Sequence, residues 1–268
     1  MCLILFSYQP GIRSTDSGRL IIAANRDEAF RRPTDPAGFW ADAPRVFAGR
    51  DRNHGGTWLG VTRQGRFAAL TNYREPGMHD PAAPSRGALV SDFLRTEIAA
   101  ADYCRLIATR NGQWNGFNLL AYDGRELWYV SNRGSHAQPV APGVHGLSNH
   151  LLDTAWPKVL EGRDRLVRAL TASDQAGTVR ATLFELLDDR TIAADAQLPA
   201  TGLPIERERL LSAAHILPVQ PDDPMSGYGT RCATVVLIDS DTLDVTERAF
   251  DAHGKVLAQS RACWPIAS

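Results

Sequence analysis

Two apolar runs near the beginning of the chain predict strands that are buried on both faces. Residues 2–8 and 20–24 are apolar without the alternation of a half-exposed strand. Such strands belong to the interior of a layered fold, with other elements packed on each side. The segment 32–44 that follows is rich in proline and predicts a loop.

Later segments alternate between the periods of strands and helices. Strands are predicted at 57–62, 67–73, 117–122, 126–131, 230–238, 243–250 and 255–262. One helical face is shared by Leu89, Val90, Phe93, Leu94 and Ile98. A second stripe comprises Trp156, Val159, Leu160, Leu166, Val167 and Leu170, and a third comprises Val179, Leu183, Leu186 and Leu187.

The ends of the second helix are marked by local signals. Asp153 and Thr154 are candidates for its N-cap, and Pro157 fits its first turn. Strands, a helix, strands, helices and strands follow one another along the chain. This order predicts an α+β fold in which helices cover antiparallel sheets. Because no linker is evident, we expect one domain over residues 1–268.

Composition excludes several classes of function. The net charge of −1 disfavours nucleic-acid binding. No apolar run approaches the roughly 20 residues of a membrane span, and no basic segment precedes the apolar N-terminus as in a signal peptide. The four cysteines form no C-x-x-C pair, so thiols and a cytoplasmic location are expected. No metal or cofactor motif is present, and a small molecule is the expected partner.

Cys2 is the first candidate for chemistry. Removal of Met1 would leave a thiol and an α-amine on one residue, and an amine with a pKa of about 7.7–8.0 accepts protons near neutrality. The amine can then activate its own side chain as a nucleophile. Alternatively, Cys2 is a small apolar residue at the start of a buried strand. The nucleophile hypothesis predicts a native mass one methionine below the full translation.

Polar residues at the ends of other strands are further candidates. Strand alternation places Asn25 and Asp27 on one side and Arg26 on the other. Asp27 would lie beside Cys2 if the first two strands are neighbours, although the motif taken alone favours a charged strand end entering a loop. Asn72 and Asn149 each follow a short extended segment. Asparagine side chains donate to oxyanions but also occur as turn residues.

Two other positions have open interpretations. Arg231 begins an apolar strand, where an arginine is either a solvated strand end or a charge directed into a site. Near a thiol, it would favour the thiolate. The loop His54-Gly55-Gly56-Thr57-Trp58 allows close backbone approach, but its spacing is not that of a phosphate-binding loop.

Taken together, these motifs resemble those of the NRDE family, also called the transport and Golgi organisation 2 family. The motifs are Met1-Cys2, Asn25-Arg26-Asp27-Glu28, Gly55-Gly56-Thr57-Trp58, Thr71-Asn72-Tyr73-Arg74, Ser148-Asn149 and Gly229-Thr230-Arg231. That family in turn resembles the N-terminal nucleophile (Ntn) hydrolases of the bile salt hydrolase and penicillin V acylase group. The resemblance implies a four-layer αββα sandwich with two antiparallel sheets between helical layers.

The resemblance also implies roles for individual residues. Cys2 matches the nucleophile and Asp27 the aspartate that binds its amine. Asn72 matches an oxyanion-hole asparagine, Asn149 a positioning asparagine, and Arg231 an arginine near the thiol. We assign Asn25, Arg26, Trp58 and Tyr73 to substrate binding. One departure is that Ala24 occupies the position of an arginine in the bile salt hydrolase group, whereas Arg26 lies between Asn25 and Asp27.

Two functional hypotheses follow from the resemblance. In the first, the chain is a cysteine Ntn amidohydrolase or acyltransferase acting on a non-peptide C–N amide bond. In the second, it is a non-catalytic carrier of a hydrophobic ligand such as haem, because some family members are linked to haem trafficking. Trp58, Tyr73 and Tyr228 would line such a carrier site, with Cys2 or His54 as an axial ligand. A retained Met1 would lie against Asp27 and Asn72 and block the cleft.

Overall fold

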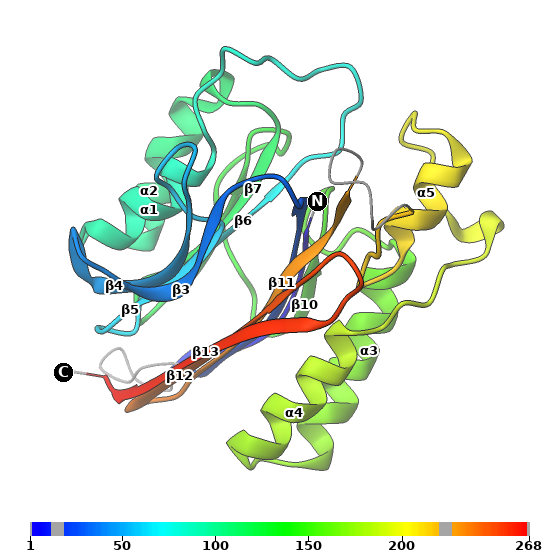
Figure 1. Cartoon of the computed structure of the whole chain (residues 1–268). Helices are drawn as coiled ribbons and strands as arrows, with labels where there is room; N and C mark the ends of the chain where they lie inside the picture. The colour runs from blue at the N-terminus through cyan, green and yellow to red at the C-terminus, as the bar shows by residue number, and fades with distance from the viewer. Residues whose placement is uncertain (1, 12–18, 220–226, 267–268) are drawn as a thin grey trace.

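The strands of the chain form two antiparallel sheets that pack face to face (Figure 1). The computed structural model describes residues 2–11, 19–219 and 227–266, and the strand counts refer to these. The sequence also predicts a turn at Asp16-Ser17-Gly18; this turn and Met1 lie outside the described residues. The six strands of the first sheet are, in sheet order, β10 (Gly143–Leu147), β1 (Cys2–Gln9), β2 (Arg19–Ala29), β11 (Tyr228–Ile238), β12 (Thr242–Phe250) and β13 (Val256–Pro265).

The second sheet has seven strands within the described residues. In sheet order these are β3 (Thr34–Trp40), β4 (Ala43–Asp51), β5 (Leu59–Thr62), β6 (Phe67–Asn72), β7 (Phe117–Tyr122), β8 (Leu127–Ser131) and β9 (Gln138–Pro139). Every pair of neighbouring strands in both sheets is antiparallel. The strands predicted at 57–62, 67–73, 117–122, 126–131, 230–238, 243–250 and 255–262 are confirmed, as β5–β8 and β11–β13.

Helices cover the outer face of each sheet. Helices α1 (Gly87–Arg95) and α2 (Ala100–Thr109) pack on the second sheet, and α3 (Pro157–Ala172) and α4 (Ala176–Leu187) pack on the first. Helix α5 (Ile205–Ser212) and the 3₁₀ turns Asn111–Gln113 and Asp195–Gln197 complete the helical elements of the described residues. The predicted four-layer αββα sandwich is confirmed.

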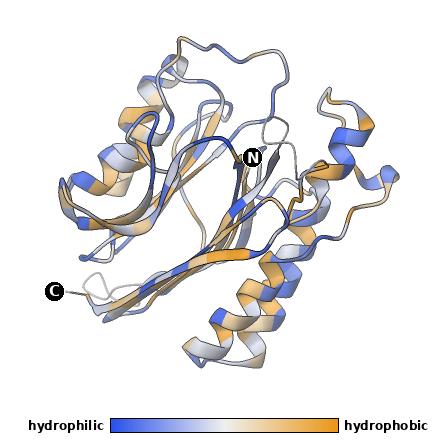
Figure 2. Ribbon diagram, viewed as in Figure 1, coloured by the Kyte–Doolittle hydropathy of each residue, from blue (hydrophilic) through white to orange (hydrophobic). Residues whose placement is uncertain are grey.

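Apolar side chains fill the three spaces between these layers. Between the sheets, Ile4 and Phe6 of β1 meet Phe67 and other buried residues of the second sheet. The alternate residues Leu3 and Leu5 face α3 and α4, so β1 is buried on both faces as predicted. Figure 2 shows hydrophilic and hydrophobic bands side by side on α3 and α4, the amphipathic pattern of helices that cover a sheet.

Helix α3 approaches the first sheet closely at Gly162. A Cβ added there would lie 2.6 Å from Leu5 Cδ1, so a larger residue would require the fully buried Leu5 side chain to move. The stripe predicted for α3 is therefore partly wrong. Leu160 and Val167 are 46% and 47% exposed, because the face that α3 turns toward the sheet carries Val159, Gly162, Leu166 and Ala169 instead.

Two predicted boundaries are also wrong. The predicted loop at 32–44 contains β3, an edge strand whose register shifts between Asp35 and Gly38. An edge position and an irregular register accommodate proline. Helix α3 has Trp156 as its N-cap residue, with Pro157 in its first turn as predicted. Asp153 instead accepts hydrogen bonds from the Gly146 amide at 2.9 Å and binds His145 at 2.7 Å.

Strand β2 extends further than its apolar pattern. It continues through the polar residues to Ala29 because β1 and β11 pair with it on both sides. A second helix, α2, follows α1 and was not predicted, because Ile98 was assigned to the face of the first helix. In the part of the chain that the structure describes, no helix combines the length and apolar character of a bilayer crossing.

Candidate functional site

A cavity of about 280 Å³ opens where β1 begins and where β2 and β6 end. Its wall is completed by the loop between β4 and β5 and by the segment that leads into α1. Five of the residues predicted for the site line this cavity: Cys2, Arg26, Asp27, Trp58 and Asn72. The strand register therefore brings together residues that are far apart in the sequence.

Cys2 is the first residue of β1 and is 9% exposed. Burial raises the pKa of its thiol, and the negative charge of Asp27 acts in the same direction. The backbone N–H of Asp27 and the guanidinium of Arg26 partly oppose this shift. The resting thiol is accordingly protonated at neutral pH, and its use as a nucleophile requires a nearby base.

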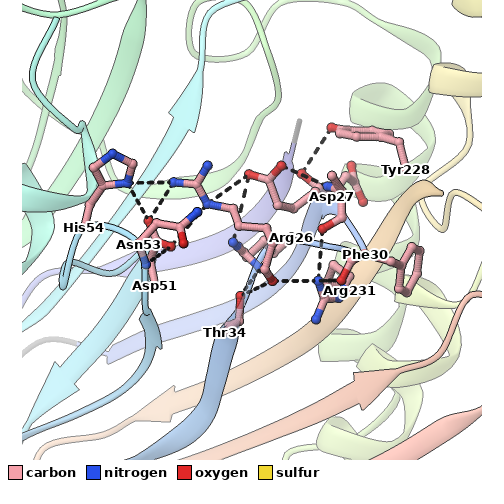
Figure 3. A network of polar contacts seen from close by, with 12 residues as sticks. Arg26, Asp27, Phe30, Thr34, Asp51, Asn53, His54, Tyr228 and Arg231 are labelled. Atoms are coloured by element: carbon pink, nitrogen blue, oxygen red, sulfur yellow. Dashed lines mark hydrogen bonds and ion pairs between the residues drawn. The ribbon is translucent and has the colours of Figure 1, made fainter. Parts of the chain in front are cut away.

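Asp27 is held at the end of β2 by the neighbouring strand β11. Thr230 Oγ1 donates a 2.6 Å hydrogen bond to Asp27 Oδ1. The hydroxyl of Tyr228 donates to the backbone carbonyl of Asp27 at 3.1 Å (Figure 3). With only 2% of the residue exposed, the carboxylate is fixed beside the start of β1.

Arg26 pairs directly with Cys2 in the β1–β2 register, so both side chains share one face. Its guanidinium lies 4.1 Å from the centre of the Trp58 ring. Nη1 donates to Thr34 Oγ1 at 3.4 Å, and Nη2 is 4.0 Å from Glu28 Oε2. Ala24, which replaces an arginine of the bile salt hydrolase group, lies two residues earlier on the same face of β2. Arg26 therefore places a positive charge on the strand face where Ala24 carries none.

Asn72 and Asn149 are joined by a hydrogen bond. Asn149 Nδ2 donates to the carbonyl oxygen of Asn72 at 2.8 Å. The adjacent Ser148 donates from Oγ to the carbonyl oxygen of Cys2 at 3.0 Å. The segment after β10 thus ties the end of β6 to the start of β1 and fixes Asn72 relative to Cys2.

Four predicted residues lie outside the cavity lining: Asn149, which contacts Asn72 as described above, and Asn25, Tyr73 and Arg231. Asn25 Nδ2 donates to the carbonyl oxygens of Leu187 and Ala214 at 2.8 and 2.9 Å, on the helical side of the first sheet. The Tyr73 ring lies 4.9 Å from the His150 ring. Arg231 is described below.

A register shift between Thr230 and Cys232 re-directs Arg231. Its Nη1 donates to the carbonyl oxygens of Ala29, Phe30 and Arg32 at 2.9–3.1 Å. In Figure 3 these contacts lie at the end of β2. Arg231 therefore stabilises the turn that follows the strand of Asp27.

A polar network that the sequence did not reveal lies along the cavity. Arg32 binds Asp51 with Nη2 at 2.6 Å and Nε at 3.2 Å, and His54 Nδ1 lies 3.1 Å from Arg32 Nη2. Burial alone would raise the pKa of Asp51, but the hydrogen bond and charge of Arg32 lower it. The network joins segments predicted as loops. Loops have no regular hydrophobic pattern, so the sequence did not indicate that these side chains would meet.

Two other cations were also missed. Arg86 lines the cavity at the start of α1, and its Nη1 donates to the Gly116 carbonyl at 2.8 Å. Lys158 is buried at the second position of α3. The chain has only two lysines, and Lys158 follows Trp156 within a predicted buried stripe, which is the signal that could have identified it.

Comparisons with known proteins agree on one family. Residues 1–252 match the family described as "Transport and Golgi organisation 2". The chain is 37% identical to the Transport and Golgi organization protein 2 homolog of Bos taurus over 262 residues, and 36% identical to that of Homo sapiens over 266 residues. In both, the match covers 93% of each chain. The Drosophila melanogaster protein is 29% identical over 283 residues, covering 95% of each chain.

Two solved structures resemble the chain more distantly. One is the Caenorhabditis elegans ortholog of N-acylethanolamine-hydrolyzing acid amidase, with a TM-score of 0.48, 12% identity, and coverage of 88% of this chain and 92% of that one. The other is the C2A mutant of conjugated bile acid hydrolase from Clostridium perfringens, with a TM-score of 0.41, 10% identity, and coverage of 98% and 96%.

Proposed function

The chain belongs to the transport and Golgi organisation 2 family, and for this member we propose a cysteine Ntn amidohydrolase or acyltransferase that acts on a non-peptide C–N amide bond. The observation that supports the proposal is the position of Cys2. It opens β1 at the wall of the cavity, with Asp27 and Asn72 in the same lining. The proposal retains a cytoplasmic location and a small-molecule substrate.

The reaction begins with activation of the thiol. After removal of Met1, the α-amine of Cys2 accepts the thiol proton, and the thiolate attacks the amide carbonyl carbon. Because burial raises the thiol pKa, this base is needed at neutral pH. Asp27 holds the ammonium that forms.

The remaining steps return the enzyme to its resting state. The tetrahedral oxyanion accepts a hydrogen bond from the side-chain amide of Asn72. Collapse breaks the C–N bond, and the leaving amine takes the proton from the α-ammonium. Water, or a second amine, then attacks the thioester and releases the acyl group while the Cys2 thiol is regenerated.

The carrier hypothesis receives less support from the cavity. Of the three aromatic residues suggested for it, Trp58 lines the cavity, whereas Tyr73 and Tyr228 do not belong to the lining described. The Trp58 ring is covered by Arg26 at 4.1 Å. His54 Nδ1 lies within 3.3 Å of Asp51 and Arg32.

The proposal predicts covalent acylation at Cys2. An alkyne-tagged acyl electrophile should label the native protein once, on a tryptic N-terminal peptide that lacks Met1. Cys2→Ala should abolish the label while leaving the melting temperature within a few degrees. Cys263→Ala is the control, because Cys263 is an exposed thiol remote from the cavity lining. Undiminished labelling of the Cys2→Ala variant would falsify the proposal.

A further inference from the structure

Lys158 is a buried cation that the proposed reaction does not use. The residue is 6% exposed. Among the described residues, its Nζ has no hydrogen-bond partner. An ammonium removed from water needs compensating negative charge. Nearby carboxylates must therefore stabilise the charged form of Lys158.

The charges around Lys158 are balanced. Asp27 and Glu208 stabilise its ammonium, and Arg74 opposes it. Arg74 forms an ion pair with Glu208 through Nη1 and Oε2. Arg74, Lys158 and Glu208 line one small cavity beside Trp156.

Arg74 also acts on Asp27, but its guanidinium is already paired with Glu208. Ile21 and Ala23 of β2 pack with Val159 of α3, and strand alternation places Asp27 on this same face. Among the described residues, Lys158 on α3 is therefore the cation of the group that has no hydrogen-bonded carboxylate of its own and that acts on Asp27.

Other titratable groups nearby leave this balance unchanged at neutral pH. Burial raises the pKa of Tyr228 and of Cys232 and lowers that of His215, so all three are neutral. Arg26 and Arg86 line the larger cavity. Arg207, a further cation that acts on Arg74, lies over the Tyr228 ring. Burial lowers the pKa of Lys158 to about 8, which leaves most of it charged at pH 7.

We propose that Lys158 is a positioning residue for the nucleophile: its ammonium neutralises Asp27, so that the α-amine of Cys2 stays unprotonated and serves as the base. This inference rests on the proposed function. Without a second cation, a carboxylate beside the α-amine would favour its ammonium form and weaken the base. With Lys158 present, Asp27 orients the amine without keeping it protonated in the resting protein, and it holds the ammonium only when the thiol proton is transferred.

The first test measures Lys158 itself and needs no activity. In protein labelled with ¹³C at lysine Cε, two signals are expected, from Lys158 and Lys255, and Lys255→Arg assigns them. Asp27→Asn should lower the pKa of Lys158, because it removes an anion that stabilises the ammonium. The pKa of exposed Lys255 should not move. An unchanged Lys158 pKa would overturn the inference even if the enzyme proved active.

The second test measures the base. In protein labelled with ¹⁵N-cysteine and lacking Met1, the amine nitrogen of Cys2 can be titrated directly. Lys158→Met should raise its pKa by about one unit or more, and the acid limb of the labelling rate should move to higher pH by the same amount. Lys255→Met and Lys158→Arg should both keep the native value.

A double variant distinguishes the loss of the Lys158 charge from misfolding of Lys158→Met. Lys158→Met combined with Glu208→Gln removes one charge of each sign, so the α-amine pKa should return toward the native value. An amine pKa that is the same in all these variants would refute the role of Lys158. A native protein that shows this shift but is never acylated would contradict the proposed reaction instead.

Discussion

Asn149 positions Asn72 through a buried hydrogen bond, and the consequences of losing each residue differ. Asn149→Ala should lower the free energy of unfolding by about 1–2 kcal/mol, since it leaves the Asn72 carbonyl without this donor. It should also slow acylation. Asn72→Ala should slow acylation by roughly 10²–10³-fold with a smaller effect on stability, because Asn72 is partly exposed.

Asn25 provides the matched control for this pair. It is also buried and donates two hydrogen bonds, but toward α4 rather than the cavity. Asn25→Ala should lower stability in urea denaturation while the labelling rate of the folded protein stays within about twofold. Equal rate losses in Asn25→Ala and Asn72→Ala would argue against a specific role for Asn72.

Strand alternation explains which side chains of the site could be placed from the sequence. The pairing of β1 with β2 follows from two adjacent apolar runs, so the proximity of Cys2 and Asp27 could be predicted. Arg231 could not be placed, because a register irregularity reverses the alternation that the sequence implies. Lys158, Arg74 and Glu208 come from three distant segments, and no local pattern signals their meeting.

At the scale of elements, the loop between β4 and β5 is held against the start of α1 by glycine. A Cβ at Gly56 would lie 2.6 Å from the backbone carbon of Gly87. The close approach predicted for this loop is therefore present, and it places Thr57 and Trp58 in the cavity wall. Local sequence could identify the glycines but not their partner on α1.

Gly56→Ala should displace this loop. Because its Cβ would meet backbone rather than a flexible side chain, we expect a loss of about 1–3 kcal/mol in stability and slower acylation. Gly38→Ala is the control, since a Cβ there meets nothing within 4 Å. Denaturation curves and labelling rates for both variants would decide the matter; equal stability of the two would contradict the packing argument.

Across the whole molecule, Glu247 joins the two sheets. Its Oε1 on β12 accepts a 2.8 Å hydrogen bond from the Ala37 amide on β3, and Oε2 accepts one from Thr234 at 3.2 Å. Burial raises the pKa of this carboxyl. A folded-state pKa above the unfolded value means that the folded protein binds the proton more tightly, so this contribution to stability declines as the pH rises above about 4.5.

Glu247→Gln should reveal that decline. The amide keeps an acceptor for Ala37 but has no ionisation cost, so the stability of the native protein relative to the variant should fall from pH 5 to pH 8. Urea denaturation at several pH values measures the difference, with the exposed Glu185→Gln as control. A difference independent of pH would show that Glu247 does not titrate as expected.

The two sheets also differ in how their strands are distributed along the chain. The second sheet is continuous in sequence from 34 to 139. In the first sheet, β1 and β2 pair with each other, but β1 also pairs with β10 from the middle of the chain, and β2 with β11 at 228–238. During synthesis, the N-terminal strands emerge first and wait for partners that are made late. The first sheet, which carries Cys2 and Asp27, is therefore completed only after β11 has been made, and the removal of Met1 that the proposed mechanism requires has this interval available.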